Sequence, residues 1–204
     1  MENERKNVVM QTKEEFLSCI IPELVNAKTN ARDLADSPHR MLSSEIAVMY
    51  THMVIDSGMV IRLHINSGIA EAMGIVEQEL YEAAVRNMNG QYIVVDIQDI
   101  LGFGPRDEMV VITNESAYKG AACILQEDAL KDASRMLGGD FLAIPSSIHE
   151  FICITGAMGA DPAKVKEISS WVNTDSGCVE RDDILGTKPL FYDSKAGILK
   201  EVDV

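Results

Sequence analysis

Two apolar runs on either side of a short turn give the strongest structural signal in the sequence. Residues Glu45–Ile55 and Met59–Ile65 are rich in Val, Ile, Tyr and Met, and Asp56-Ser57-Gly58 lies between them. Val, Ile and Tyr favour strands, and Asp, Ser and Gly favour the tight turn that joins two antiparallel strands. The sequence therefore predicts a β-hairpin, and with it an antiparallel sheet.

A helix is predicted to begin at Thr12, ahead of this hairpin. Thr12 and Glu15 have the spacing of a capping box, in which each side chain bonds a free backbone N–H at the helix start. Apolar residues follow at helical spacing, namely Phe16, Leu17, Ile20, Ile21, Leu24 and Val25. We expect a helix that runs through Val25 and is kinked at Pro22, followed by a loop over residues 26–38.

Helices and strands are both expected after the hairpin. The predicted helices cover residues 67–73, 77–88 and 128–137, with a further helix opening at Asp161-Pro162. The predicted strands cover residues 109–113, 121–125, 140–144 (stopped by Pro145), 151–155 and a closing hairpin within 190–199. Hairpins mixed with amphipathic helices indicate an α+β fold, a mostly antiparallel sheet with helices packed on one face.

The 204 residues are expected to form one compact unit with two parts. Residues 1–11 are predicted to be a flexible N-terminal tail. The Gly- and Pro-containing segment Gly102–Asp107 is the best candidate for a joint. We therefore expect an N-terminal helix-hairpin-helix subdomain over residues 12–101 and a C-terminal α+β subdomain over residues 102–204.

The charge balance argues against two classes of partner. The chain carries 18 Lys and Arg residues against 32 Asp and Glu residues, a formal net charge of −14. Duplex nucleic acids and anionic membrane surfaces are both bound by clustered positive charge. We therefore expect neither nucleic acid nor membrane as a partner.

Targeting signals and cysteine usage favour a cytoplasmic protein. The apolar run Val8–Met10 is shorter than the 7–15 residues of a secretory signal, and no stretch approaches the roughly 20 apolar residues of a spanning helix. The four cysteines form no C-x-x-C pair. We expect reduced thiols, with Cys123 and Cys153 buried in apolar runs.

The segment Pro145–Glu150 is the first candidate for chemistry. It combines two hydroxyls (Ser146, Ser147), an imidazole (His149) and a carboxylate (Glu150). A serine nucleophile needs an adjacent base that a carboxylate orients, so these four residues are candidate catalytic residues of a hydrolase-like enzyme. In the alternative interpretation Ser147 and Glu150 form a capping box that ties down a tight turn. Known triads draw their members from distant parts of a chain, which favours this structural interpretation.

The loop between the strands predicted at 109–113 and 121–125 is the second candidate. Asn114 tolerates left-handed backbone and Gly120 permits close approach, so a shaped loop is expected. Asn114, Tyr118 and Lys119 are the candidate ligand-binding residues. A plain hairpin connection is the structural alternative.

The expected topology separates these two candidates. A helix that crosses over between strands 121–125 and 140–144 would make them parallel. The loop that contains Lys119 and the turn that contains His149 would then lie at opposite ends of the sheet. We therefore expect Lys119 and His149 to be out of reach of each other.

No cofactor or metal site is predicted. The sequence contains no H-E-x-x-H, no G-x-x-x-x-G-K-[ST], no G-x-G-x-x-G and no G-x-S-x-G. A metal site built from His149, Glu150 and Cys153 would fit no standard zinc spacing.

Three segments carry a resemblance to a known family: Val111–Asn114, Gly120–Ala122 and Asp140–Glu150. They resemble a bacterial family known only as a domain of unknown function, common in gut anaerobes. The resemblance covers residues 45–200 and is most specific at Pro145–Glu150. It implies the same α+β fold, and it implies no activity, cofactor or substrate.

The functional hypothesis is a non-enzymatic cytoplasmic protein that acts by binding a protein partner or by self-association. No catalytic constellation is complete, and long apolar strands such as 45–55 need a partner at any exposed edge. The alternative is a hydrolase-like enzyme that uses the Ser/His/Glu cluster. A third hypothesis is a small-molecule sensor built on the loop around Tyr118.

Overall fold

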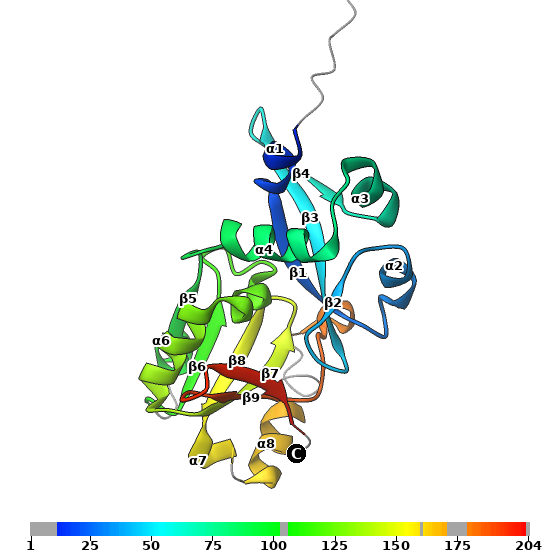
Figure 1. Cartoon of the computed structure of the whole chain (residues 1–204). Coiled ribbons are helices and arrows are strands. Elements are labelled where there is room, and N and C mark those ends of the chain that lie inside the picture. The colour runs from blue at the N-terminus through cyan, green and yellow to red at the C-terminus, as the bar shows by residue number, and fades with distance from the viewer. Residues whose placement is uncertain (1–11, 103–105, 160, 171–178, 203–204) are drawn as a thin grey trace, which may run out of the picture.

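The computed structural model describes residues 12–102, 106–159, 161–170 and 179–202. It contains helices and two antiparallel sheets (Figure 1), which confirms the α+β class. No helix in these ranges is both long and apolar enough to cross a membrane. The predicted tail 1–11, the middle of the predicted joint, and Trp171 and Cys178 lie outside the described residues.

The first sheet contains the predicted hairpin. Its strand order is β1 (Ile20–Asn26), β3 (Ile46–Asp56) and β2 (Arg40–Met41), and β4 (Met59–His64) pairs with the outer half of β3. Ser57 and Gly58 form the turn between β3 and β4, both with positive φ (51° and 81°). This backbone matches the primed turns that suit a two-residue hairpin. The hairpin prediction is confirmed.

The second sheet is wholly antiparallel and contains most of the later strands. Its order is β10-β9-β7-β8-β6-β5. In chain order the strands are β5 (Ile93–Asp96), β6 (Met109–Thr113), β7 (Phe141–Ser147), β8 (Glu150–Thr155), β9 (Leu190–Asp193) and β10 (Ile198–Glu201). The strands predicted at 109–113, 140–144 and 151–155 and the closing hairpin are confirmed.

The helices over residues 67–73, 77–87, 127–137 and 162–170 begin close to their predicted positions. The helix Ala31–Ala35 lies within the segment 26–38 that the sequence predicts as a loop, and the helices Ile97–Leu101 and Gly156–Gly159 have no counterpart among the predictions. In chain order the helices are α1 (Lys13–Leu17), α2 (Ala31–Ala35), α3 (Ser67–Met73), α4 (Glu77–Asn87), α5 (Ile97–Leu101), α6 (Glu127–Leu137), α7 (Gly156–Gly159) and α8 (Pro162–Ser170), with 3-10 helices η1 (Gly120–Leu125) and η3 (Arg181–Asp183). Gly74 and Gly138 end α3 and α6 in the left-handed conformation. Helices cover both faces of the second sheet, a wider coverage than the one face expected.

The first predicted helix is wrong beyond Leu17. The capping box forms, since the Glu15 N–H donates to Thr12 Oγ1 (3.2 Å) and the Thr12 N–H donates to Glu15 Oε2 (2.8 Å). The chain then becomes strand β1, because half of residues 20–25 are β-branched and β3 offers a pairing partner. Pro22 fits there because β1 is an edge strand, so its missing N–H removes no bond from the ladder.

Two other local predictions are also wrong. Residues 121–125 form the buried 3-10 helix η1 and not a strand, so there is no parallel crossover to β7. Pro145 does not end its strand, because β7 continues to Ser147 and Pro145 pairs with Phe151. The register shifts between Pro145 and Ser147, and β9 pairs only with residues 141–143 of β7, so the proline lies where the ladder is already interrupted.

One hydrophobic core extends across both sheets. It joins Ile20 and Tyr50 of the first sheet to Val110 and Phe151 of the second, with Leu80 of α4 among them. Strand β5, which precedes the predicted joint, pairs within the second sheet. The division into subdomains over 12–101 and 102–204 stays a prediction.

Candidate functional site

The hydroxyl-rich segment 145–150 forms the turn between β7 and β8. Ser146 and Ser147 are buried, and both hydroxyls donate to Glu150 Oε1, at 2.9 and 3.3 Å. The Ser147 hydroxyl also accepts the His149 backbone N–H at 3.0 Å. The polar groups of Ser146, Ser147 and Glu150 are therefore engaged with one another inside the turn.

The His149 ring contacts groups outside this turn. Its Nδ1 accepts the Lys119 backbone N–H at 3.0 Å, and its Nε2 lies 3.4 Å from Asp183 Oδ2. An acceptor at Nδ1 places the proton of the neutral ring on Nε2, facing the Asp183 carboxylate. A serine nucleophile is activated by a hydroxyl-to-imidazole bond. Both ring nitrogens here have other partners, and Glu150 orients hydroxyls and not the imidazole.

The two candidate segments lie side by side, which overturns the expectation that Lys119 and His149 are out of reach of each other. Besides the bond from Lys119 to His149 Nδ1, the Thr113 hydroxyl donates to the His149 carbonyl (2.8 Å) and the Ala121 N–H donates to the Ile148 carbonyl (3.2 Å). The physical reason is η1: a helical turn after Lys119 keeps the chain at this end of the sheet, where a strand would have carried it away.

The loop after β6 has a fixed and strained shape. Asn114 bonds the backbone of Tyr118 twice, through its carboxamide oxygen (3.3 Å) and its nitrogen (3.0 Å). Ala117 and Lys119 both have left-handed backbone, with φ of 49° and 53°. A residue with a Cβ loses about 1–2 kcal/mol in this conformation. Such strain persists where the surrounding contacts over-determine the structure, often at functional sites.

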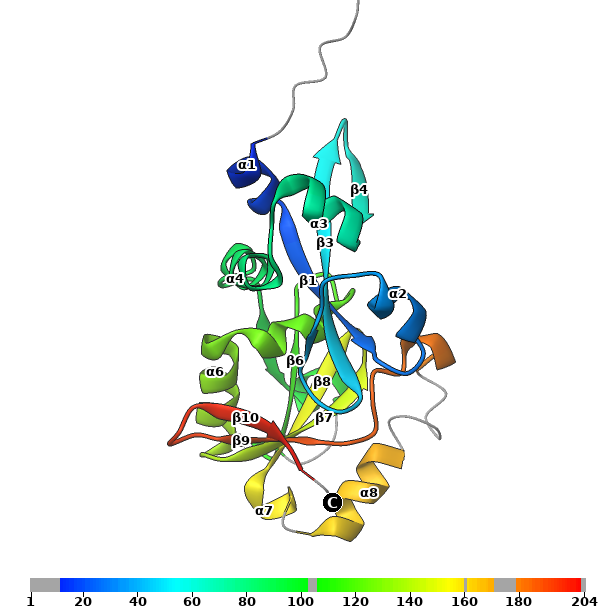
Figure 2. The same ribbon diagram turned by 45° about the vertical axis from the view of Figure 1, so that its right-hand side comes forward.

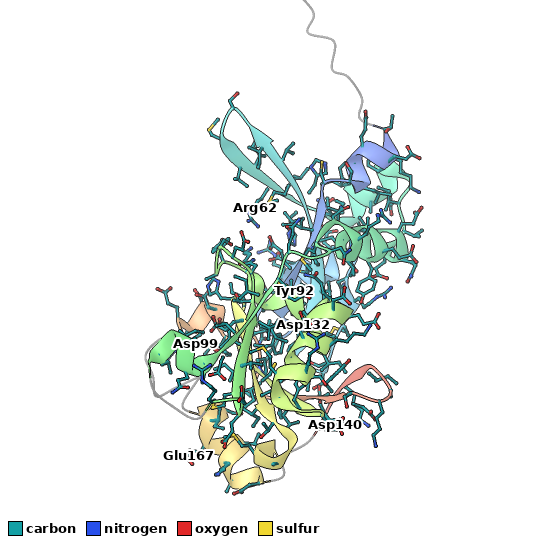
Figure 3. All side chains as sticks on the ribbon, turned by 90° about the vertical axis from the view of Figure 1, so that its left-hand side faces the viewer. Arg62, Tyr92, Asp99, Asp132, Asp140 and Glu167 are labelled. Carbon is teal, nitrogen blue, oxygen red and sulfur yellow. The ribbon has the colours of Figure 1, made fainter. Side chains whose placement is uncertain are left out.

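A buried carboxylate links this loop to the first sheet. Lys119 Nζ lies 2.6 Å from Glu23 Oε2, and Arg62 Nη1 lies 3.0 Å from Glu23 Oε1. The Glu23 side chain on β1 is 7% exposed, whereas those of Arg62 and Lys119 are about one-third exposed. Figure 3 shows Arg62 on the hairpin side that faces the second sheet. Two cations from different elements therefore share one carboxylate.

These side chains line one cavity. Asn114, Tyr118 and Lys119, the three predicted ligand-binding residues, surround a volume of about 190 Å³ together with Glu23 and Arg62. Glu23 and Arg62 are absent from the sequence predictions, because residues 20–25 fit a helical stripe and a lone arginine in a strand carries no motif. Only the pairing of β1 and β4 with β3 reveals that they meet.

The described residues offer no support for a reactive thiol or for a metal site. Burial raises the pKa of the Cys123 thiol to about 11 and raises the pKa of the fully buried Cys153 thiol as well. Both are free, as expected, and Cys19 is also free. No group of three or more His, Cys, Asp or Glu side chains within the described part of the chain is arranged to hold a metal ion.

The fold and the cavity together define an α+β protein with a cavity between its first sheet and the loop that follows β6. The chain matches the family model for DUF5688, a family of unknown function, over residues 2–194, and it belongs to this family. The resemblance to a domain family without assigned function is thereby confirmed. Searches of curated proteins and of solved structures returned no match.

Proposed function

We propose that this protein acts by binding protein through the β3–β4 hairpin, and that the partner is a second copy of the chain. The observation that carries the proposal is β4 itself: all six of its residues, Met59–His64, are exposed. Among the described residues β4 pairs with β3 alone, so its outer edge presents free N–H and C=O groups. An edge of this kind is a template for adding another strand.

The hairpin also exposes a concentration of large apolar side chains. Figures 1 and 2 show it projecting away from the body of the molecule. The most exposed of its apolar residues are Ile55 (70%) and Met59 (65%). The full set is Val54, Ile55, Met59, Val60, Ile61 and Leu63. Apolar side chains gathered on one projecting element are typical of an interaction surface.

A second copy is the occupant that the hairpin suits best. Residues 51–64 contain one acidic residue, Asp56, and one basic residue, Arg62, in a chain of net charge −14. Two copies can meet there with little of the repulsion that the rest of the surface would impose. An antiparallel pairing of two β4 strands centred on Ile61 places Met59 of each copy opposite Leu63 of the other, on one face.

The proposal is tested by measuring molar mass with light scattering over a concentration series. We expect the wild-type chain to dimerise and Ile61→Lys to remain monomeric, since a lysine on the new seam would bury a charge. Ile198→Lys is the matched control: it changes an equally exposed isoleucine (55% against 48%) on the edge strand β10, and it should dimerise like the wild type. A wild-type chain that stays monomeric, or equal dimerisation of all three proteins, would contradict the proposal.

The hydrolase alternative draws less support from the geometry. The hydroxyls of Ser146 and Ser147 donate to Glu150, and the ring nitrogens of His149 face Lys119 and Asp183. Hydrogen bonds of this kind are typical of a structural turn, which is the alternative interpretation of the segment 145–150.

A further inference from the structure

We propose that the cavity formed by Glu23, Arg62 and Lys119 binds the carboxylate group of a small organic monoacid. Glu23 accepts one bond from each cation. A guanidinium has five N–H donors, and Nη1 is the only Arg62 nitrogen that donates within the described part of the chain. Arg62 lines the cavity and therefore keeps N–H donors for a second acceptor, and a guanidinium is suited to bind a carboxylate.

The charge of the cavity favours a monoanion. One carboxylate and two cations leave a local charge of +1 in a chain whose total is −14. A bound carboxylate brings the local charge to zero. A phosphate group carries about −1.5 to −2 at neutral pH, so it would leave an excess of negative charge that the acidic chain would not stabilise.

The size and the walls of the cavity restrict the rest of the ligand. Its volume of about 190 Å³ is below the roughly 300–1,000 Å³ of pockets for drug-sized molecules. Ile21, Pro22, Met53 and Met88 supply an apolar wall beside the charged groups. A short aliphatic acid of the size of propionate or butyrate matches both features.

The loop holds its binding groups in place before any ligand arrives. The Lys119 N–H is fixed by His149 Nδ1, and the Tyr118 ring packs near that imidazole, with ring centroids 5.6 Å apart. The Arg62 guanidinium lies 5.4 Å from the centre of the same tyrosine ring. Groups that are already ordered lose less conformational entropy on binding, which favours affinity for a small ligand.

The proposal predicts that substitution of Glu23 changes the affinity for the ligand in the opposite direction to substitution of Arg62 or Lys119. Glu23 competes with an incoming carboxylate for the two cations. Glu23→Gln should therefore strengthen binding of propionate, whereas Arg62→Gln and Lys119→Met should each weaken it by about tenfold, because each removes a charge-assisted hydrogen bond. A purely structural triad predicts that all three substitutions act in the same direction. Lys131→Met, on the exposed face of α6, is the control and should leave binding unchanged.

The experiment titrates the full-length chain with propionate and follows amide chemical shifts of the 114–120 loop by NMR. Propionamide, the neutral analogue, and inorganic phosphate are titrated in parallel, and circular dichroism confirms the fold of each variant. We expect saturable shifts with propionate and weaker binding, by about tenfold or more, for the other two compounds. The same titration on Ile61→Lys should give wild-type affinity, so this result does not depend on dimerisation.

Three results would overturn the proposal: no saturable binding of propionate, equal binding of propionamide or phosphate, or weaker binding by Glu23→Gln. If Glu23→Gln fails to fold, Arg62→Lys replaces it. That variant keeps the charge but loses the fork geometry, and it should bind propionate more weakly than the wild type.

Discussion

At Gly120 the chain leaves no room for a side chain. A Cβ there would lie 2.3 Å from Thr113 Oγ1, 2.7 Å from the Asn114 nitrogen and 2.7 Å from the His149 carbonyl oxygen. Two of these three atoms belong to backbone, so they cannot move aside easily. Gly120 is thus the residue that lets η1 pack against the turn between β7 and β8, and that packing brings Lys119 beside His149.

Gly120→Ala should lower the free energy of unfolding by about 1–3 kcal/mol or more, because an overpacked site displaces its neighbours and here breaks the bond from Thr113 to His149. Chemical denaturation measures the change. Gly68→Ala on α3 is the control, since its Cβ would meet only Asn66 Oδ1 at an ordinary 3.5 Å. That variant should be neutral or more stable by up to about 1 kcal/mol. Equal effects at the two positions would contradict the close packing at Gly120.

The segment 145–150 shows, at the residue scale, that a short motif does not by itself determine the contacts of its side chains. The segment has the composition of a catalytic cluster, although the sequence favours a structural turn. The hydroxyls of Ser146 and Ser147 bond locally to Glu150, but the ring nitrogens of His149 contact Lys119 and Asp183, which lie 30 and 34 positions away in the sequence. Contacts between residues 30 or more positions apart have no local sequence signal.

At the scale of elements, local patterns predict those structures whose signals are unambiguous. The β3–β4 hairpin, α3 and α6 each have a turn or cap residue in the sequence, and α4 has a clear apolar face; all four are found close to their predicted bounds. Strand β1 fails because Ile20, Ile21, Leu24 and Val25 fit a helical stripe as well as a buried strand. The partner strand β3 decides between the two, and its paired residues lie 20 to 32 positions away in the sequence.

Helix α5 depends on one buried carboxylate. Asp96 is 2% exposed; its Oδ1 accepts the Gln98 N–H and its Oδ2 accepts the Asp107 N–H, both at 2.8 Å. The side chain thus caps the helix and also fastens the chain that returns to β6. This second bond spans the segment that the sequence indicated as a joint.

Asp96→Ala should lower the free energy of unfolding by about 2 kcal/mol, since it removes a helix cap and leaves the Asp107 N–H without its partner. Asp99→Ala is the matched control: Asp99 is half exposed, and its ion pair with Arg106 lies at the surface, so its loss should cost about 0–1 kcal/mol. Thermal or urea unfolding of both variants gives the comparison. A larger loss for Asp99→Ala would show that the buried cap is not the stabilising contact.

At the scale of the whole molecule, two carboxylates fasten the end of the chain to the first sheet. Glu201 on β10 accepts bonds from the Ser44 N–H, the Lys188 ammonium and the Ser44 hydroxyl, which hold the pKa of its carboxyl at about 2. Burial raises the pKa of Glu45, but the backbone N–H groups of Thr187 and Lys188 outweigh it and lower that pKa. Glu201 bonds Ser44, and Glu45 bonds Thr187 and Lys188. Each of these contacts joins residues that are more than 100 positions apart in the sequence.

These lowered pKa values predict acid sensitivity. A carboxyl whose pKa is lower in the folded state stabilises the fold above its unfolded pKa of about 4.5, and the stabilisation disappears as pH falls toward the folded value of about 2. Thermal unfolding midpoints measured between pH 7 and pH 2 should therefore fall more steeply for the wild type than for Glu201→Gln. Glu71→Gln, an exposed change on α3, should keep the wild-type slope. Parallel curves for the wild type and Glu201→Gln would contradict this role of Glu201.

Long-range geometry also explains which parts of the candidate cavity the sequence could indicate. Asn114, Tyr118 and Lys119 are close in sequence and share a loop with turn residues, so a local reading finds them. Glu23 and Arg62 reach the same cavity only because β1 and β4 pair with opposite edges of β3. The exposed edge of β4 follows from the same arrangement, since no strand of the described chain covers it.

Cysteine trapping at β4 tests the central proposal most directly. In an antiparallel pair centred on residue 61, the two copies of Ile61→Cys would have Cα atoms about 4.5–5.5 Å apart, within the range of a disulfide. We predict that mild oxidation converts Ile61→Cys into a covalent dimer on a non-reducing denaturing gel, whereas the wild type and Ile198→Cys form no cross-link and run on this gel as single chains. Failure of Ile61→Cys to cross-link, or equal cross-linking of Ile198→Cys, would contradict pairing through β4.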